Sequence, residues 1–491
     1  MAEKFRASLP ANDVLDILIV GAGISGINAA YRIQSHFPKY TYMILEGRGQ
    51  MGGTWDLFRY PGVRSDSDLF TFGFEWSPWE KLSPIADGES IRQYLHKSAS
   101  MHGIDKKIQY GHLLTNASWS SKDCLWTLKA LYGRQQLQYK ARFLVFGTGY
   151  YNYNEPLEAK IPRIEQFQGQ TVHPQFWPED LDYANQQIVV IGSGATAITL
   201  VPSLAKKAAK VTMLQRSPTY ILSIPNKALK RPWYCHLLSQ KLYFMVRRLL
   251  WIISGRLFIW YCHRWPDGAR RMIEKSTTQQ LPVQIPYDPH FNPSYRPWQQ
   301  RVCFCPDGDF FKSLQSGKAT VETSIIQEVV PDGIVPASGK KLAADIIVTA
   351  TGLQLQMFGG VKIEVDGKPL NPSEKYMWNG VMIQDMPNAA FVFGYTDASW
   401  TLGADITAKF ICKYLKYLER QSYRAAVPYL PESISLLPAS TINLQSTYVT
   451  LGAANLPKSA AESPWTGRKG FIPDYAWLKL GRLDRGLTFI K

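Results

Sequence analysis

Two glycine-rich turns carry the clearest chemistry in the sequence. The first follows a short apolar strand, Asp16 to Val20, and contains Gly21, Gly23 and Gly26 as G-x-G-x-x-G. In such a turn the first glycine permits a tight bend and the second lets the backbone approach a pyrophosphate. The third lets the following helix, expected at 27–37, pack on the strand with its N-terminus directed at phosphates. The pattern predicts a dinucleotide site.

An acidic residue completes this first site. The segment YTYMILE reads as the second strand and ends at Glu46. A carboxylate at that distance from the glycine turn accepts hydrogen bonds from ribose hydroxyls. Turn and acid together favour a bound dinucleotide over a glycine turn with no ligand.

A second unit of the same kind begins near residue 187, with a strand at 187–191. Its turn contains Gly192, Gly194 and Ala197, a helix is expected to about 207, and another strand at 210–214. Gln215 and Arg216 stand where the first unit has its acid. A guanidinium pairs with a 2′-phosphate that a carboxylate would repel, so this site is expected to prefer NADPH. The alternative is that Arg216 only caps a surface strand.

Two dinucleotide sites with different ribose chemistry indicate a flavoprotein that binds FAD first and NADPH second along the chain. FLVFGTGYY (143–151) and DIIVTATGLQ (345–354) are apolar strands ending in small-residue turns, as expected where the chain crosses between two such domains. No C-x-x-C follows Gly26, so disulfide reductase chemistry is not expected.

Between the two turns lies the pattern F-x-G-x-x-x-H-x-x-x-W-P, made by Phe167, Gly169, His173, Trp177 and Pro178. This segment resembles the fingerprint of type I Baeyer–Villiger flavin monooxygenases, in the branch with the ethionamide-activating enzymes of mycobacteria. The resemblance continues at 51–70, 294–303 and 394–402, and covers about residues 14–470. It implies a linker whose histidine couples domain movement to cofactor binding. Gly169 would permit a bend, and a purely structural His173 is the alternative.

The resemblance also assigns the catalytic pair Arg301 and Asp66. A fixed positive charge beside the flavin would keep a flavin peroxide deprotonated for attack on a ketone, and the aspartate would hold the arginine. A surface position for Arg301 and local turn hydrogen bonding for Asp66 are the alternatives. Gln300 stands where many relatives carry a lysine, which leaves discrimination against NADH to depend on Arg216.

The resemblance carries further cofactor positions onto this chain. For FAD these are Gly21, Gly23, Ser25, Gly26, Glu46, Thr54, Trp55, Asp56, Asp66 and Leu114. For NADP they are Gly192, Ser193, Gly194, Ala195, Thr196, Gln215 and Arg216.

The predicted activity is NADPH-dependent oxygen insertion beside a ketone carbonyl, with O2 as co-substrate and with sulfides and thioamides as further substrates. The aromatic, basic region after residue 218 favours a long-chain or aromatic ketone. A sulfur- or nitrogen-oxygenating flavin enzyme is the nearest alternative, and a non-catalytic flavin-binding partner protein is the other.

The length of 491 residues favours two or more domains. The two glycine turns and the resemblance imply an α/β chain of two Rossmann-like domains with a helical insertion. We expect 1–155 and 356–491 to form the FAD domain and 156–355 the NADP domain, with the insertion at about 218–318. The net charge is +16, but no nucleic-acid motif accompanies it. The six cysteines suggest free thiols in the cytoplasm, and Cys303 and Cys305 lack the partners of a metal site.

The region 241–265 is the most membrane-like part of the chain. Arg247, Arg248 and Arg256 interrupt it, so it is not expected to span a bilayer. Peripheral contact with the inner face of a membrane, or a position lining an apolar substrate entrance, is one interpretation. A buried helical subdomain is the other.

Overall fold

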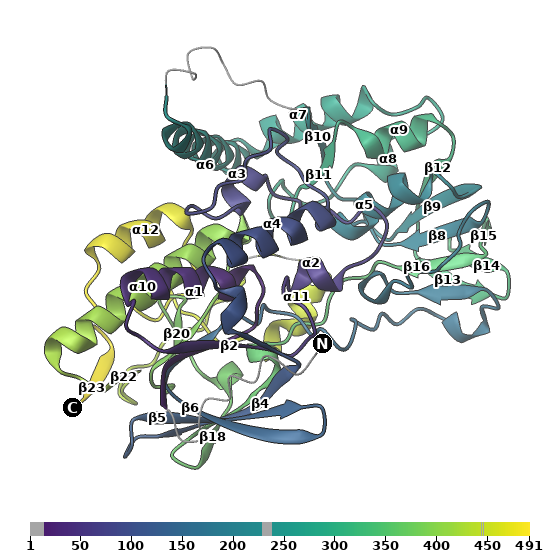
Figure 1. Ribbon diagram of the computed structural model, residues 1–491. Helices are drawn as coiled ribbons and strands as arrows, with labels where there is room; N and C mark the ends of the chain where they lie inside the picture. Colours follow the sequence, from purple (N-terminus) through teal and green to yellow (C-terminus); the bar gives the residue numbers. More distant parts are fainter. Residues whose placement is uncertain (1–13, 228–237, 443, 445) are drawn as a thin grey trace.

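The computed structural model describes residues 14–227, 238–442, 444 and 446–491. One of the six cysteines, Cys235, lies outside the described residues. Figure 1 shows two halves, each built around its own sheet, with a pair of helices above them.

The sheet of the first half contains nine strands within the described residues, in the order β18-β17-β4-β5-β6-β1-β2-β3, with β21 also pairing with β6. Their bounds are β1 (Val14–Val20), β2 (Tyr42–Glu46), β3 (Ile108–Tyr110), β4 (His112–Ser120), β5 (Leu125–Tyr132), β6 (Gln135–Phe146), β17 (Lys362–Val365), β18 (Lys368–Leu370) and β21 (Ala389–Phe391). Strands β6, β1, β2 and β3 run parallel, as a dinucleotide-binding unit requires.

The core of this half follows the alternation of β1. Ile17 and Ile19 lie in one apolar cluster, with the helices that cover one face of the sheet. Leu18 and Val20 lie in a second cluster on the opposite face. The helices and short turns of this half are α1 (Ile24–His36), α2 (Thr54–Leu57), α3 (Leu69–Phe72), α4 (Gly88–Met101), η1 (Asp105–Lys107), η5 (Phe358–Gly360), η6 (Pro372–Glu374), α10 (Trp400–Gln421), α11 (Thr447–Gly452), η7 (Ala453–Asn455) and α12 (Phe471–Leu480).

The second half contains a fully parallel sheet in the order β12-β9-β8-β16-β7. Its elements are η2 (Ile164–Gln166), β7 (Gln170–Val172), η3 (Pro174–Phe176), β8 (Gln187–Ile191), α5 (Ala195–Leu204), β9 (Lys210–Gln215), β12 (Ala319–Thr323) and β16 (Ile346–Thr349). A small antiparallel sheet of β13 (Ile326–Val330), β14 (Gly333–Pro336) and β15 (Leu342–Ala343) is attached to it.

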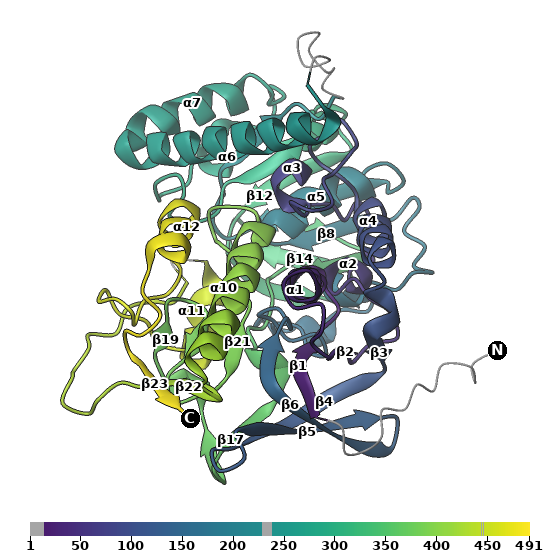
Figure 2. The same cartoon turned by 60° about the vertical axis from the view of Figure 1, so that its left-hand side comes forward.

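The insertion after β9 contains α6 (Gln240–Arg264), α7 (Pro266–Thr278), α8 (Tyr287–His290) and α9 (Asp309–Gln315), with a parallel strand pair, β10 (Ile221–Ile224) and β11 (Cys303–Pro306). Figure 2 shows α6 and α7 together at the top of the molecule. Shorter strand pairs, β19 (Met377–Trp378) with β20 (Met382–Ile383) and β22 (Ala425–Pro428) with β23 (Leu487–Ile490), complete the C-terminal region. The predicted α/β class with a helical insertion is confirmed.

The third glycine of the first turn has a strict steric role. A Cβ on Gly26 would stand 1.9 Å from the carbonyl oxygen of Gly21. We therefore expect Gly26→Ala to lower the free energy of unfolding by about 3 kcal/mol, since backbone would have to move. Thermal and denaturant unfolding measure this change.

Gly49→Ala is the matched control, because a Cβ on Gly49 would meet no atom within 4 Å. Equal stability of the two variants would contradict the steric role of Gly26.

Candidate active site

The first glycine turn joins β1 to α1 with almost no free space around its backbone. Gly21 has φ +95°, a conformation that side chains rarely adopt, and its Cβ would stand 2.8 Å from the oxygen of Gly147. Gly23 faces Gly53, where a Cβ on Gly23 would lie 3.6 Å from the Gly53 Cα. The N-terminus of α1 is therefore presented through bare backbone, which fits a pyrophosphate.

Glu46 ends β2 beside this turn and is buried. Its carboxylate accepts hydrogen bonds from the backbone nitrogens of Ala22, at 2.7 Å, and Arg48, at 2.9 Å. Burial raises the pKa of Glu46, and the two backbone donors and Arg48 oppose that effect. These hydrogen bonds fix the carboxylate at the end of β2, beside the first glycine turn.

The turn at 52–57 closes over the first one. Gly52 donates to the oxygen of Ala22, and the hydroxyl of Thr54 lies 2.6 Å from that of Tyr151. Trp55 packs edge-to-face on Phe72.

Asp56 is buried and pairs with Arg48 at 2.8 Å and Arg59 at 3.0 Å. Its carboxylate is thus already engaged by two arginines within the protein.

Two other predicted FAD positions make different contacts. The hydroxyl of Ser25 accepts a hydrogen bond from the indole of Trp400 at 2.8 Å. Leu114 is buried in the apolar cluster that contains Val20 and Leu45, so the structure places it in the core below the turn.

The second glycine turn, between β8 and α5, repeats the geometry of the first. Gly192 has φ +132°, and its Cβ would stand 2.3 Å from the oxygen of Ala350. A Cβ on Gly194 would meet no atom within 4 Å, so space is open beside the helix N-terminus. Ala195 and Thr196 begin α5, and Ser193 donates to the oxygen of Ser217. This turn fits a second pyrophosphate.

The two residues predicted to read the 2′-phosphate differ in exposure. Arg216 is exposed, and its guanidinium donates to the hydroxyl of Thr447 at 3.3 Å. Gln215 is buried, and its amide donates to His290 and Thr323, at 2.7 and 2.9 Å. Of the two side chains, only that of Arg216 is therefore open to solvent and free to approach a phosphate.

Asp66 and Arg301 come from different halves of the chain, and the fold brings their charges into interaction. Burial lowers the pKa of Arg301, but attraction from Asp66 and from two tyrosines outweighs it, so the pKa lies above the usual value. The two groups form no ion pair within 4 Å. The neighbouring Arg64 instead pairs with Asp309 of α9, and Asp68 caps α3 by accepting from the Thr71 nitrogen.

Sequence reasoning missed Tyr150 and Tyr448. These two tyrosines interact electrostatically with each other and with Arg301. The neighbouring Tyr448 and burial raise the pKa of Tyr150 well above the usual value, against the effect of Arg301. Tyr150 also stacks on Trp400, with ring centroids 5.2 Å apart. The run GTGYY, directly after β6, was a sequence signal that could have indicated Tyr150. No sequence signal indicated Tyr448, which lies in α11.

The fingerprint segment is not a simple linker. Residues 170–172 form β7, the edge strand of the second sheet, paired in parallel with β16. Gly169 is needed for close approach and not for a bend, because its Cβ would stand 2.3 Å from the oxygen of Asp345. Phe167 packs near β14 in a small apolar cluster, and Trp177 is buried against α5 in a larger one, just before Pro178.

His173 lies between β7 and η3, and its Nδ1 accepts from the backbone nitrogen of Gln175 at 3.2 Å. A small cavity of about 30 Å³ beside it is also lined by Tyr60, Thr196 and Gly352. His173 therefore lies where three segments meet: the second glycine turn, the loop after α2, and the segment 350–353 that follows β16.

The loop after α2 joins the two halves. Tyr60 is buried in the apolar cluster of the second sheet, and a Cβ on Gly62 would stand 1.9 Å from the hydroxyl of Ser203. Arg59 approaches Glu179, just after the fingerprint, at 3.7 Å. The segment that leads to Asp66 is thus held by the second half.

Comparison with known proteins decides the family. The chain matches the flavin-binding monooxygenase-like family at 79–269 and the NAD(P)-binding Rossmann-like domain at 19–85. It is 42% identical over 482 residues to the FAD-containing monooxygenase EthA of Mycolicibacterium smegmatis, covering 97% of each chain. This chain belongs to the FAD-containing monooxygenases.

Solved structures agree on the fold of this monooxygenase. A cyclohexanone-bound structure of cyclohexanone monooxygenase matches with TM-score 0.74 at 19% identity, over 97% of this chain and 99% of that one. A structure of OTEMO with FAD and NADP matches with TM-score 0.73 at 17% identity, over the same shares. Family membership confirms the predicted resemblance, the enzyme class and the cofactors FAD and NADPH.

No helix in the described part of the monooxygenase combines the length and apolar character needed to cross a bilayer. The same part of the chain holds no group of three or more histidine, cysteine or acidic side chains arranged for a metal.

The environment of His173 predicts a pH effect. Burial lowers the pKa of His173, so the unfolded chain takes up a proton more readily than the native monooxygenase. Stability contributed by this site is therefore present above the usual histidine pKa of about 6.5 and is lost as pH falls below it. We expect His173→Gln to lose less thermal stability than wild type between about pH 7.5 and about pH 5.5.

The exposed His36 supplies the control, and His36→Gln should follow wild type. Parallel melting curves for His173→Gln and wild type across this range would contradict the prediction.

Proposed function

We propose that this monooxygenase inserts one oxygen atom of O2 beside a ketone carbonyl, giving an ester or lactone and water at the expense of NADPH. The observation that carries the proposal is the placement of Arg301 at the junction of the two halves. There its guanidinium interacts electrostatically with Asp66, Tyr150 and Tyr448. FAD, once bound and reduced, supplies the activated oxygen. The residues of the chain bind, orient and stabilise charge.

In this proposal Arg301 is the catalytic cation. Like any arginine it stays positive throughout the working pH range, and its surroundings raise its pKa further. A fixed cation beside the reacting carbonyl stabilises the negative charge that develops on the ketone oxygen during addition. Asp66 forms no ion pair with Arg301 within 4 Å, and its charge favours the positive form of the guanidinium from a longer distance.

The two cofactor domains are part of the same proposal. Residues 1–155 and 356–491 form the FAD domain, and 156–355 the NADP domain with its insertion. Gly23, Glu46 and the 52–54 turn would hold FAD, and Gly194, Thr196 and Arg216 would hold NADPH. His173, against the loop that carries Tyr60, couples movement of the two domains.

Sulfides and thioamides are proposed as further substrates. Oxygen transfer to sulfur requires a protonated oxygen donor, and the hydroxyl of Tyr150, protonated at neutral pH like that of any tyrosine, interacts with Arg301. This hydroxyl can supply the hydrogen bond that such a transfer needs.

The proposed place of action is the cytoplasm, with peripheral contact at the inner face of the membrane through 241–265. The proposed ketones are long-chain or aromatic. Helix α6 rests on α3, just beyond Asp66, through Arg248, which donates to the oxygens of Phe70 and Gly73. The apolar and aromatic composition of α6, which contacts the segment that follows Asp66, supports a preference for such substrates.

Replacement of the cation tests the ketone activity. We expect Arg301→Ala to lower kcat for ester formation by about 100-fold or more, because charge on the ketone oxygen would lose its stabilising partner. NADPH should still bleach the yellow enzyme. Products from aliphatic ketones and a thioether are identified by mass spectrometry, with Arg301→Lys as the charge-conserving control. Ester formation that survives in Arg301→Ala, or sulfoxide as the sole wild-type product, would sink the ketone proposal.

Arg216 is expected to determine the nicotinamide preference. Arg216→Ala should lower kcat/KM for NADPH by about 10- to 100-fold and leave that for NADH nearly unchanged, because only NADPH carries the 2′-phosphate. Steady-state reduction kinetics measure both values, and Arg216→Lys should lie between. An equal loss with both cofactors would show that Arg216 acts on folding or on another part of the site.

A further inference from the structure

Helix α6 presents apolar side chains to solvent. Its outward row, here called the α6 row, recurs every three or four residues and is 45–60% exposed. The row consists of Met245, Leu249, Leu250, Ile253, Leu257 and Trp260. A helix on the surface of a protein in water ordinarily turns such a row inward.

The charged residues in the middle of α6 point the other way. Arg247 is buried, donates to the oxygen of Trp79 at 2.5 Å and lies over the ring of Phe70. Arg248 donates to two backbone oxygens in and after α3, and Arg256 pairs with Asp397. These three arginines therefore bond the helix to the rest of the protein. The α6 row takes no part in these bonds and faces solvent.

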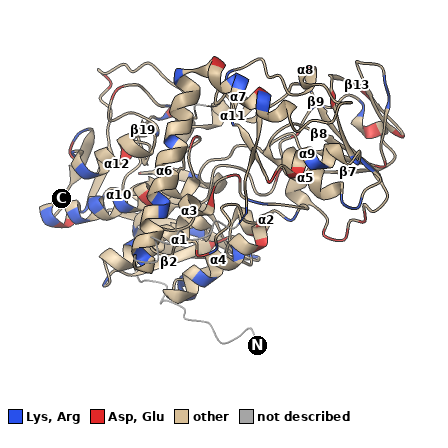
Figure 3. Cartoon of the chain, turned by 90° about the horizontal axis from the view of Figure 1, so that it is seen from above, with Lys and Arg blue, Asp and Glu red and all other residues tan. Residues whose placement is uncertain are grey.

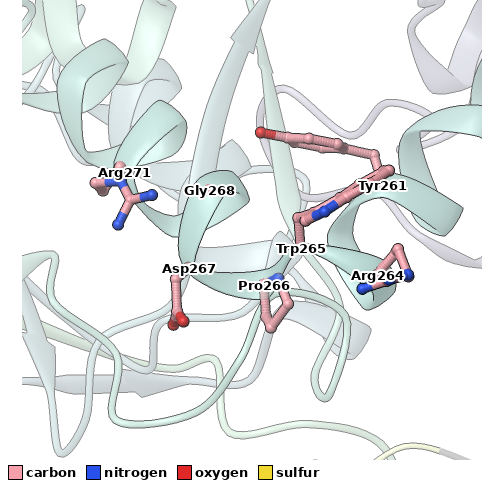
Figure 4. A pocket seen from close by; sticks show the side chains of 7 residues that line it. All are labelled: Tyr261, Arg264, Trp265, Pro266, Asp267, Gly268 and Arg271. Atoms are coloured by element: carbon pink, nitrogen blue, oxygen red, sulfur yellow. The ribbon is translucent and has the colours of Figure 1, made fainter.

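An open hollow of about 580 Å³ lies where α6 turns into α7 (Figure 4). The lining residues are Tyr261, Arg264, Trp265, Pro266, Asp267, Gly268 and Arg271. Neither Arg264 nor Arg271 forms an ion pair with the described residues, and Arg264 lies 5.3 Å from the centre of the Trp265 ring. Trp260, the last residue of the α6 row, packs edge-to-face on Trp265. Row and hollow thus form one continuous surface.

The charge of this region suits an anionic partner. Helix α6 contains no acidic residue, and α6 and α7 together carry eight basic residues and two acidic ones. Three of the eight are the arginines bonded within the protein, which leaves five basic residues, and one of the two acids, Asp267, lines the hollow. Figure 3 shows these basic positions along the two helices. A second copy of the chain docked through the same face would set basic ends against basic ends, with no carboxylate on α6 to pair them.

We propose that α6 lies in the surface of an anionic phospholipid bilayer, with the α6 row among acyl chains and the 261–271 hollow around a lipid phosphate. This inference deepens the membrane contact in the proposed function. Tryptophan and arginine favour the headgroup level, where an aromatic ring and a phosphate-binding cation are both satisfied. Each basic residue near such a surface contributes about 1 kcal/mol. The absence of a spanning helix from the described residues is consistent with a helix lying in the surface.

The test is co-sedimentation of the full-length, FAD-loaded enzyme with vesicles of phosphatidylcholine, with and without phosphatidylglycerol. Wild type should bind the phosphatidylglycerol vesicles, and binding should weaken with added salt and without the anionic lipid. The row variant Leu249→Ser with Leu257→Ser, and the hollow variant Arg264→Gln with Arg271→Gln, should each bind about tenfold more weakly or worse.

Matched controls lie on remote, exposed surfaces. Ile325→Ser tests loss of an exposed apolar side chain, and Arg134→Gln with Lys368→Gln tests loss of two exposed charges. Both controls should bind as wild type does. Oxidation of a short, water-soluble ketone without vesicles should be the same in all of these variants, so failure of membrane binding is distinguishable from failure of the proposed activity.

Three results would overturn the inference. In the first, wild type would not sediment with any vesicle. In the second, the row and hollow variants would bind as tightly as their controls. In the third, analytical ultracentrifugation without lipid would show a wild-type dimer that the row variant converts to monomer. The α6 row would then be a subunit interface.

Discussion

Close contact between bare backbone segments is the constraint on which this structure depends. At the first turn Gly21 meets the oxygen of Gly147, and at the second Gly192 meets the oxygen of Ala350. Gly147 and Ala350 belong to the two segments by which the chain crosses between its halves. Side chains at either turn would push these crossings away. The same contacts that clear space for phosphates therefore also fix the passage between the halves.

The proposed active site lies at this passage because charge and hydroxyl groups converge there from distant parts of the chain. Asp66 comes from the loop after α2, Tyr150 from the first crossing, and Arg301 from the insertion. Tyr448 is added by α11, whose first residue, Thr447, also contacts Arg216. Arg216 and the neighbourhood of Arg301 are thus connected through one short helix.

Three arginines of the insertion suggest one property of α6 in the sequence and a different one in the folded structure. In the sequence, Arg247, Arg248 and Arg256 interrupt an apolar run and weaken its likeness to a membrane segment. In the folded chain they bind carbonyl oxygens and Asp397, so the polar groups are used within the protein. The outward face is consequently more apolar than the composition of the helix suggests.

The sequence by itself determined the two glycine turns, their flanking strands and the cofactors, because these depend on local spacing. Strand β8 spans the predicted 187–191, while α5 ends at Leu204 instead of about 207. The carried-over site roles and the domain boundaries stay predictions. Tertiary structure alone decided that residues 170–172 of the fingerprint form an edge strand and that the amide of Gln215 is hydrogen-bonded within the protein. It also decided that Tyr448 interacts electrostatically with Arg301. It also decided which face of α6 is exposed. These features depend on contacts between residues far apart in the chain, which local spacing does not encode.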